Sequence, residues 1–353
     1  MEINTLDEKE AAILRQWIAA SERIVICAHK SPDGDAMGAA LAWNEYLRQL
    51  GKTPFVVVPD AYPDFLQWLP GSERVLRYDR KPEVVTALFQ QADLVFCLDF
   101  GESSRVEAMQ QVLMSSPARK VMIDHHLNPS DEMDLVISRP SLCSTCELVF
   151  RIVWQLGDFE RMNRKWATCI YCGMMTDTGA FTYNSNSPVI FFIISQLLTK
   201  HIDKDLIYRR VFNNYSSYAI RLRGYLMDQK LQVWEDLHAA CFTLTREEMQ
   251  RYHFIKGDVE GLVNQPLRIK DLKLSIYQIV LLSIYLREDT EQDNLIYVSL
   301  RSVDDFPCNE MAANFFHGGG HLNASGGKLA CSLEEAKAVV ERAVNAYSER
   351  LRA

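Results

Sequence analysis

The fold of the amino-terminal half is decided by one stretch of this 353-residue chain, Ile24-Val25-Ile26-Cys27-Ala28-His29-Lys30-Ser31-Pro32-Asp33-Gly34-Asp35. Its five leading apolar residues predict a strand that is buried on both faces. Pro32 and Gly34 favour a tight turn, and the apolar spacing over 35–50 predicts a helix that Gly51 ends. This order of strand, turn and helix indicates the first unit of an α/β parallel sheet.

Two more apolar runs end in the same kind of polar cluster. Residues 94–98 lead into Asp99, and residues 121–123 lead into Asp124-His125-His126. Ligands of open α/β sheets bind beyond the carboxyl ends of the strands, so we expect these side chains to converge with those of the first stretch. Acids crowded in this way repel one another, and a pair of divalent cations is the simplest compensation.

A fourth segment, Thr176-Asp177-Thr178-Gly179-Ala180-Phe181, adds another carboxylate after an apolar run. Each segment alone has an ordinary explanation: Asp33 is as readily a helix N-cap as a metal ligand, and Asp177 could cap a turn. All four segments in order within one domain favour a metal site. Mixed imidazole and carboxylate donors favour Mn²⁺ over Mg²⁺, while Zn²⁺, Co²⁺ and Fe²⁺ also fit.

The length and charge of the chain narrow the classes of function. At 353 residues two domains are expected, with a formal net charge of −8. An acidic chain is poorly suited to binding long duplexes, although short anionic substrates remain compatible. The acidic amino terminus lacks the basic region of a signal peptide, and the apolar stretch at 189–194 is too short to cross a membrane. Thr5 and Glu8 predict a capping box for a first helix.

The nine cysteines predict a cytoplasmic protein with reduced thiols, because their number is odd and they are widely spread. Two pairs, Cys143/Cys146 and Cys169/Cys172, imitate the spacing of zinc ligands. Both pairs fall in predicted helices, of which one continues over 147–156 and the other over 167–175, in apolar company. This context favours buried thiols over a zinc site.

In the second half the pattern changes after a predicted connecting helix over 205–229. Strands are predicted at 240–245 and 295–301, and a closing helix at 333–350. The last strand ends in Arg301, which can grip a phosphate, and a glycine-rich loop follows at Gly318-Gly319-Gly320-His321. Consecutive glycines let backbone N–H groups approach an anion, although a flexible loop and a surface arginine would explain the same residues.

The four amino-terminal motifs resemble those of the DHH phosphoesterases, whose name describes the triplet standing here as Asp124-His125-His126. The resemblance covers nearly the whole chain and implies an α/β fold. Its amino-terminal parallel-sheet DHH domain with flanking helices would span 1–204. A linker helix over 205–232 and a smaller α/β DHHA1 domain over 233–353 would follow. It also implies a ligand set for two divalent cations, most readily Mn²⁺ with Mg²⁺ or Co²⁺ as substitutes: His29, Asp33 and Asp99 for one ion, and Asp35, Asp99, His125 and Asp177 for the other.

By the same resemblance, two further residues act in catalysis: Asp124 orients a histidine, and His126 lies near the phosphate or the leaving group. The carboxyl-terminal motifs resemble the DHHA1 domain, which holds substrate through residues matching Arg301, Asn309, Gly318, Gly319, Gly320 and His321. One departure stands out, because His317 occupies a position that is commonly glycine in the family. Tyr62, Tyr183 and Phe316 are candidates for stacking on bases.

The implied activity is metal-dependent phosphoester hydrolysis. The arrangement is similar to enzymes that degrade very short RNAs to mononucleotides and convert 3′-phosphoadenosine 5′-phosphate to AMP. Alternatives are a cyclic or linear dinucleotide phosphodiesterase, an exopolyphosphatase or pyrophosphatase, and a non-catalytic nucleotide-binding protein. The last is disfavoured because every expected ligand is present. Expected partners are short RNAs or phosphorylated nucleotides, and a homodimer is compatible with the sequence, whereas membranes and long duplexes are not expected.

Overall fold

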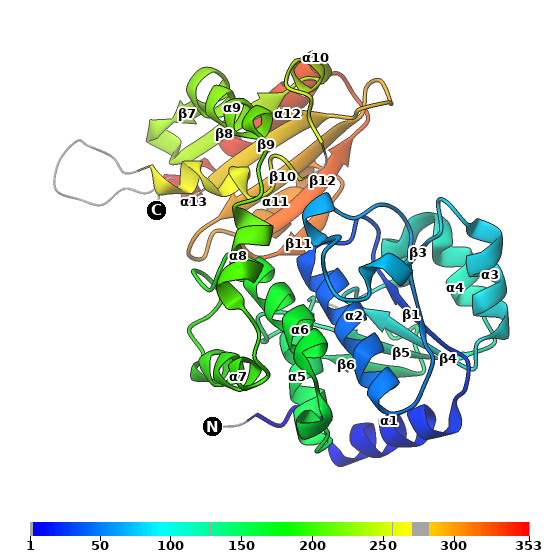
Figure 1. Ribbon diagram of the computed structural model, residues 1–353. Coiled ribbons are helices and arrows are strands. Elements are labelled where there is room, and N and C mark those ends of the chain that lie inside the picture. Colours follow the sequence, from blue (N-terminus) through cyan, green and yellow to red (C-terminus); the bar gives the residue numbers. More distant parts are fainter. Residues whose placement is uncertain (1–2, 128, 256, 270–281, 353) are drawn as a thin grey trace. The chain divides into compact units, whose positions relative to one another are not determined.

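The computed structural model describes residues 3–127, 129–255, 257–269 and 282–352, and the chain divides into two compact units, 1–214 and 215–353. Both units combine helices with a sheet, which confirms the predicted α/β class (Figure 1). The division falls inside the stretch 205–232. Where the sequence predicts a single helix, this stretch contains α8 (Lys204–Phe212), α9 (Ser217–Tyr225) and a π-helical turn.

The first unit is built on a six-stranded sheet in the order β3-β2-β1-β4-β5-β6, and all its pairings are parallel. The strands are β1 (Ile24–Ala28), β2 (Phe55–Val58), β3 (Leu76–Arg77), β4 (Leu94–Leu98), β5 (Arg119–Asp124) and β6 (Leu135–Ser138). The apolar runs at 24–28, 94–98 and 121–123 predict three of these strands, β1, β4 and β5. The order reverses between β1 and β4, and such a switch point is where ligands bind in open α/β sheets.

Helices cover both faces of this sheet, which explains why its central strands are apolar throughout (Figure 1). Alternate residues of β1 face opposite sides: Ile24 and Ile26 join one core cluster, and Val25 and Cys27 join another. The helices are α1 (Glu8–Ala20), α2 (Gly34–Gln49), α3 (Pro82–Gln91), α4 (Gln110–Ser115), α5 (Thr145–Gln155), α6 (Arg164–Asp177) and α7 (Pro188–Thr199).

Helices α2 and α6 approach closely because glycines line their contact. A Cβ added at Gly38 would lie 2.7 Å from the Cys169 carbonyl oxygen. A Cβ at Gly34 would lie 2.3 Å from the Thr176 Oγ1 atom, and one at Gly173 would lie 3.1 Å from the Asp35 Cα atom. The close approach brings the start of α2 beside the end of α6. The carboxylates of these two helix ends are thereby held on one side of the sheet.

Three features of this unit bear on local predictions from the sequence. The capping box of α1 is formed by Asp7 and Glu10, two residues later than the predicted Thr5 and Glu8. Cys143 precedes α5, because Ser144 is the N-cap, so the first cysteine pair does not share a helix face. All nine thiols are free, as expected. Among the described residues, no helix is both long and apolar enough to span a membrane.

The second unit contains a six-stranded sheet in the order β11-β12-β10-β9-β8-β7, mostly antiparallel with one parallel pair, β8 and β9. The strands are β7 (Gln232–Trp234), β8 (Ala239–Leu244), β9 (Leu282–Glu288), β10 (Ile296–Ser302), β11 (Gly319–His321) and β12 (Ala324–Leu329). The helices after α9 are α10 (Arg246–Arg251), α11 (Cys308–Phe315), α12 (Leu333–Ala346) and α13 (Ser348–Arg352).

Two predictions for the second unit are wrong in detail. The glycine-rich segment is predicted as a loop, but it pairs as a β-hairpin in which β11 runs against β12. The predicted closing helix over 333–350 is interrupted at Tyr347, so that α12 and α13 are separate. The strands predicted at 240–245 and 295–301 are confirmed as β8 and β10, each within one residue.

Candidate metal centre

The structure brings the predicted amino-terminal ligands together beyond the carboxyl ends of β1, β4 and β5. His29 follows β1, Asp99 follows β4, and Asp124, His125 and His126 stand at the end of β5. Asp33 and Asp35 begin α2, and Asp177 is the last residue of α6. Each side chain therefore stands where a regular element begins or ends, at the switch point of the sheet.

The first group of possible metal ligands consists of His29, Asp33 and Asp99. The Nε2 atom of His29 lies 3.5 Å from Asp99 Oδ2 and 4.0 Å from Asp33 Oδ1. The other ring nitrogen, Nδ1, lies 2.8 Å from the Lys30 carbonyl oxygen. That contact fixes the ring so that Nε2 faces the carboxylates, as ligating histidines usually do. Asp33 also caps α2, because its Oδ1 accepts from the backbone amides of Asp35 and Ala36.

The second group consists of Asp35, His125 and Asp177. The Nε2 atom of His125 lies 3.3 Å from Asp177 Oδ2, 3.8 Å from Asp35 Oδ2 and 3.7 Å from Asp99 Oδ1. Its Nδ1 atom lies 3.2 Å from the Leu142 carbonyl oxygen, so this imidazole is oriented in the same way as that of His29. The two oxygens of Asp99 thus face one histidine from each group.

The buried acids and histidines of this cluster have shifted pKa values, which is unusual in a folded core. Asp35 is fully buried, and burial together with the neighbouring carboxylates raises its pKa well above the usual value. Burial lowers the pKa of His125, but its contacts with Asp177 and the other carboxylates raise it well above the usual value overall. In the described part of the chain, the ion-pair partners of Asp35, Asp99 and Asp177 are histidines and not lysine or arginine.

Divalent cations fit this donor set. Imidazole nitrogens and carboxylate oxygens are borderline and hard donors, which suit Mn²⁺, Zn²⁺, Co²⁺ or Fe²⁺. Buried acids that lack a permanent cation are costly to ionise, and a bound ion would remove that cost. The geometry of the donors and the lack of permanent cations beside the buried acids are therefore both consistent with a two-ion site.

Asp124 and His126 adjoin the cluster and, with Asp99, form another group of possible metal ligands. The buried Asp124 carboxylate accepts from the backbone amide of His126 at 3.0 Å, and its Oδ1 lies 2.7 Å from His126 Nδ1. A Cβ added at the neighbouring Gly101 would lie 3.2 Å from Asp124 Oδ2, which favours glycine there. Asp124 thus fixes the orientation of the His126 ring.

The amino terminus of α5 supports the cluster, although the sequence alone did not predict this role. The backbone amides of Thr145 and Cys146 donate to Asp35 at 2.6 and 2.9 Å, and the Thr145 hydroxyl donates to Asp99 at 2.7 Å. Amides at a helix start favour a negative charge. Ser144 followed three residues later by Glu147 is an N-terminus signal that could have located this helix start. Arg105, whose charge lowers the pKa of His29, carries no such signal.

Asp99 has a strained backbone, with φ of +66°. This left-handed conformation is uncommon for a residue other than glycine, and aspartate is among the few residues that tolerate it. After Asp177, Gly179, Ala180 and Phe181 also have positive φ values. Strain of this kind collects at functional sites. Here it falls on one predicted ligand, Asp99, and on the turn that follows another, Asp177.

The predicted substrate residues lie in the second unit. Arg301 is half-buried at the end of β10, and its Nη1 donates to the Leu300 carbonyl oxygen at 2.9 Å. Asn309 lies in the first turn of α11, and its buried Oδ1 has no hydrogen-bond partner among the residues that the structure describes. Of the predicted stacking residues, Phe316 is completely buried in the core, which excludes that role for it. Tyr183 is 47% exposed.

Close backbone packing accounts for two of the three glycines of the 318–321 segment. A Cβ at Gly318 would lie 1.8 Å from the Gly326 carbonyl oxygen, and one at Gly320 would lie 2.5 Å from the Ala324 carbonyl oxygen. Only Gly319 has open space around its Cβ position. His317 has φ of +49°, which explains physically why glycine would be favoured at that position.

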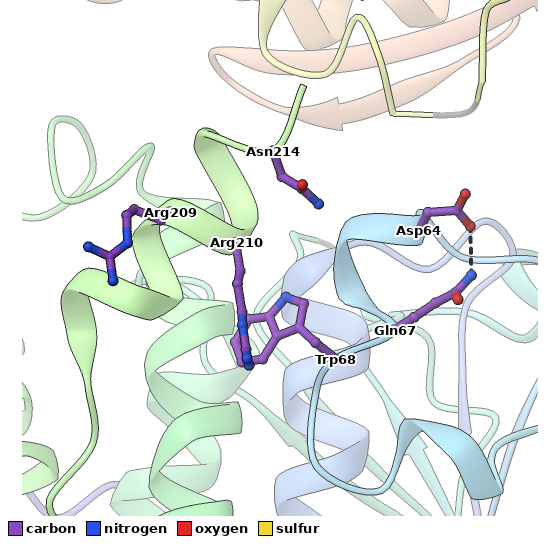
Figure 2. Close-up of a pocket in the computed structure, with 6 residues that line it drawn as sticks. All are labelled: Asp64, Gln67, Trp68, Arg209, Arg210 and Asn214. Carbon is purple, nitrogen blue, oxygen red and sulfur yellow. Dashed lines mark hydrogen bonds between the residues drawn. The ribbon is translucent and has the colours of Figure 1, made fainter. Parts of the chain in front are cut away.

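A separate hollow of about 510 Å³ lies in the first unit between α8 and the short helix at 64–66 (Figure 2). Figure 2 shows the Arg210 guanidinium over the Trp68 ring, 4.9 Å from its centroid, and a hydrogen bond from Gln67 to Asp64. None of the predicted metal ligands lines this hollow. Its cations are exposed surface arginines, so the buried cluster is the stronger candidate for a functional site.

Comparison with known proteins gives three informative relatives and one family match. Residues 23–174 match the DHH family, N-terminal domain. The chain is similar to a solved exopolyphosphatase-related protein from Bacteroides fragilis, with 47% identity, a TM-score of 0.91 and 98% coverage of both chains. It is 27% identical to the bifunctional oligoribonuclease and PAP phosphatase NrnA of Thermus thermophilus, over 98% of this chain and 95% of that protein.

The third relative is the cyclic-di-AMP phosphodiesterase GdpP of Geobacillus thermodenitrificans, which is 24% identical over 95% of this chain. The chain spans about half the length of that protein, 49%. The match to the exopolyphosphatase-related protein extends over both units, so that protein shares the whole described architecture.

Proposed function

The chain belongs to the DHH family of phosphoesterases, and from that premise we propose that it hydrolyses short oligoribonucleotides to mononucleotides and 3′-phosphoadenosine 5′-phosphate to AMP. The observation that carries the proposal is the position of Asp99, whose two carboxylate oxygens lie 3.5 and 3.7 Å from the imidazoles of two separate ligand groups. A carboxylate in that position suits a bridge between two ions.

The ligands in this proposal are His29, Asp33 and Asp99 for one ion, and Asp35, Asp99, His125 and Asp177 for the other. Mn²⁺ suits these donors better than Mg²⁺. When bound, such ions supply an activated water nucleophile and neutralise charge on the phosphoryl oxygens. The chain's own part is to hold these donors rigidly, through the carbonyl contacts of both histidines and the α5 amides at Asp35.

His126 is proposed to act on the leaving group. Its Nδ1 atom is engaged by Asp124 at 2.7 Å, so Nε2 is the nitrogen through which it would donate a proton. The contact with Asp124 would hold the ring in the orientation that this step needs. In the second unit, Arg301, Asn309, His321 and the backbone of residues 318–320 are proposed to bind the phosphate groups of the substrate.

The extent of the similarity to NrnA and to GdpP favours short oligoribonucleotides and 3′-phosphoadenosine 5′-phosphate over cyclic dinucleotides as substrates. The NrnA of Thermus thermophilus matches this chain over nearly the whole of both proteins, whereas GdpP is matched over about half of its length. The exopolyphosphatase-related neighbour makes a polyphosphate or pyrophosphate substrate the second candidate. A cytoplasmic location and a homodimer stay predictions from the sequence.

The test is product release in the presence of Mn²⁺ from five substrates run in parallel. They are an RNA trinucleotide, 3′-phosphoadenosine 5′-phosphate, a linear dinucleotide, a cyclic dinucleotide and polyphosphate. We expect mononucleotides from the trinucleotide and AMP from the second substrate, both abolished in Asp124→Ala and His125→Ala. The matched control is Asp236→Ala, an exposed aspartate outside the cluster, which should retain activity.

Other outcomes would reassign the chain. Release of phosphate from polyphosphate alone would move it to the phosphatase alternative. Cleavage of the cyclic dinucleotide alone would move it to the phosphodiesterase alternative. Activity that persists in both site variants would show that the cluster is not the catalytic centre.

A further inference from the structure

A short segment after β4 carries a cation to the first group of possible metal ligands, the group that contains His29. This segment is the 3₁₀ helix Ser103–Met109, which begins four residues after Asp99. The carbonyl oxygen of Arg105 accepts from the Lys30 amide at 2.9 Å. Lys30 directly follows His29, and its own carbonyl oxygen lies 2.8 Å from His29 Nδ1. The backbone at Arg105 is therefore attached next to a predicted metal ligand.

Further contacts hold this segment in place. At its start, the backbone amide of the buried Ser103 donates to the Glu132 carboxylate at 3.0 Å. Along its length, the side chains of Val106 and Met109 are completely buried in the core of the first unit. The Arg105 side chain is exposed, so it extends into solvent from a backbone that its neighbours fix on both sides.

The charge of Arg105 acts on the metal cluster without neutralising its acids. Burial has the largest influence on the pKa of His29 and lowers it, the carboxylates of Asp99 and Asp33 raise it overall, and the charge of Arg105 lowers it. In the described part of the chain, no ion pair joins Arg105 to an acid. A cation in this position repels a bound metal ion, so Arg105 does not serve the metal site itself.

A second cation on this side, Lys30, is already engaged by an acid. Its Nζ atom pairs with the carboxylate of Glu107. Glu107 has φ of +40° and ψ of −112°, a left-handed conformation that is strained for a residue other than glycine. Strain of this kind is typical of functional sites. The pair balances the charge of Lys30, whereas no acid among the described residues balances that of Arg105.

Exposure alone does not distinguish Arg105 from an ordinary surface arginine. Arg48 is also exposed, and it lies in the last turn of α2, where a cation favours the helix dipole. It stands roughly 20 Å along the helix from the ligands at the start of α2. Arg105 differs from Arg48 because its backbone is attached beside His29 and its charge reaches that buried ring. Its position therefore indicates an anion that binds at the metal cluster.

We propose that Arg105 binds the phosphoryl group that is hydrolysed and favours phosphomonoesters over phosphodiesters, so that it sets the balance between phosphatase and oligonucleotide hydrolysis. The inference rests on the proposed function and adds a specificity-determining residue to it. A phosphomonoester carries about 1.5 to 2 negative charges at pH 7, and a phosphodiester carries a single one. Coulombic attraction grows with charge, so a guanidinium stabilises the monoester more. Its planar fork also suits two phosphoryl oxygens at once.

The experiment compares two substrates that share 5′-phosphoadenosine and differ only in the group on its 3′ oxygen. They are 3′-phosphoadenosine 5′-phosphate, a monoester there, and the 5′-phosphorylated dinucleotide of adenosine, a diester. In Arg105→Gln, kcat/KM with Mn²⁺ should fall about 100-fold for the first and about 10-fold for the second, the range of a charged hydrogen bond. Arg105→Lys keeps the charge and should recover part of both losses. The matched control, Arg48→Gln, should leave both values unchanged.

Binding measurements separate this inference from the proposed function. Mn²⁺ is titrated calorimetrically into the metal-free parent and Arg105→Gln proteins, and inorganic phosphate is then titrated into the loaded proteins. Arg105→Gln should bind phosphate about 10-fold more weakly. It should bind Mn²⁺ at least as tightly as the parent, because a cation beside His29 has been removed. Phosphate binding that depends on Arg105 in a parent protein that hydrolyses neither nucleotide would reject the proposed function and keep Arg105 as a phosphate-binding residue.

Three results would overturn the role of Arg105. One is unchanged hydrolysis of both substrates in Arg105→Gln. Another is an equal loss for both substrates, which would show that the arginine does not distinguish a monoester from a diester. The third is weaker binding of Mn²⁺ in Arg105→Gln with unchanged binding of phosphate, which would assign the lost activity to the metal site.

Discussion

The metal cluster and the predicted substrate residues of the second unit use the two kinds of sheet in different ways. In the first unit, the ligands stand at the ends of parallel strands and helices, and most of them are buried. In the second unit, Arg301 and His321 lie on antiparallel strands and are half-exposed. The first arrangement can hold charges at fixed positions. The second leaves its polar side chains partly open to solvent.

The supports of the two regions differ in the same way. Asp35 is held by two backbone amides of α5, and both ligand histidines are held by carbonyl oxygens. The Arg301 guanidinium donates to the Leu300 carbonyl oxygen of its own strand. Substitutions in the cluster should therefore abolish activity, whereas substitutions at Arg301 should weaken the binding of substrate.

The largest expected effect follows from Asp99→Asn. Asparagine tolerates the positive φ at this position and preserves the shape of the side chain, but it removes the charge that faces both histidines. We expect kcat to fall on the order of 10³-fold, as for the loss of a central electrostatic group. Thermal melting reports whether the fold is kept, and Asp236→Asn serves as the control. Activity within about 10-fold of the parent would remove Asp99 from the centre of the mechanism.

A second prediction contrasts helical glycines of the two units. Gly173→Ala puts a Cβ 2.2 Å from Cys146 Sγ and 2.8 Å from Asp35 Oδ1, so we expect a loss of about 1–3 kcal/mol of stability and reduced activity. Gly224→Ala in α9 meets nothing within 4 Å and should stabilise by up to about 1 kcal/mol through helix propensity. Urea unfolding measures both changes. Equal effects at the two positions would contradict the close packing of α2 against α6.

A smaller effect is expected from pH in the metal-free protein. Burial lowers the folded pKa of His29, but contacts with Asp99 and Asp33 outweigh it and raise the pKa overall, and that of His125 is raised in the same way. A raised histidine pKa stabilises the fold fully below the unfolded value of about 6.5, and this stabilisation is lost as pH rises through the folded pKa. The raised pKa of Asp35 has the same sign, since that acid also binds its proton more tightly in the fold.

The unfolding midpoint in EDTA should therefore fall as pH rises above about 6.5, because the histidines of the unfolded chain lose their protons there while those of the folded protein still hold theirs. With Mn²⁺ the trend should reverse, because metal ions compete better as these protons leave. Urea titrations at several pH values, with EDTA or with Mn²⁺, measure both trends. A midpoint in EDTA that rises over this range would contradict the electrostatics of the cluster.

The sequence predicts the first unit better than the second for a physical reason. Strands buried on both faces appear as continuous apolar runs, and the acid or histidine that ends each run is visible in the sequence, as at Ala28-His29 and Leu98-Asp99. In the second unit, the glycines that look like a loop are required by close backbone contact within a hairpin. Which residues share a face there depends on pairing between strands distant in the chain, which no local pattern reveals.

The residues that hold the ligands of the cluster in place could not be predicted from the sequence, also for a physical reason. Thr145 reaches Asp99 only because α5 starts beside the switch point, and that placement is tertiary. The corrected cap of α1 shows the same limit at short range. Thr5 and Glu8 have the right spacing for a capping box, but so do Asp7 and Glu10, and the structure uses the second pair.

The smallest effects test these caps. Asp7→Ala removes a side chain that accepts from the Glu10 amide at 2.6 Å, and it should cost about 1 kcal/mol of stability. Thr5→Ala is the matched control in the first unit, because its backbone amide, which Gln155 engages at 2.8 Å, is kept; a change within about 0.5 kcal/mol is expected. Ser332→Ala removes the equivalent cap of α12 in the second unit and should also cost about 1 kcal/mol. None of the three touches the cluster or the predicted substrate residues, so activity per folded molecule should stay unchanged. A loss of activity in Asp7→Ala or Ser332→Ala beyond the loss of folded protein would mean that the geometry of the cluster or of the predicted substrate residues depends on helix ends outside them.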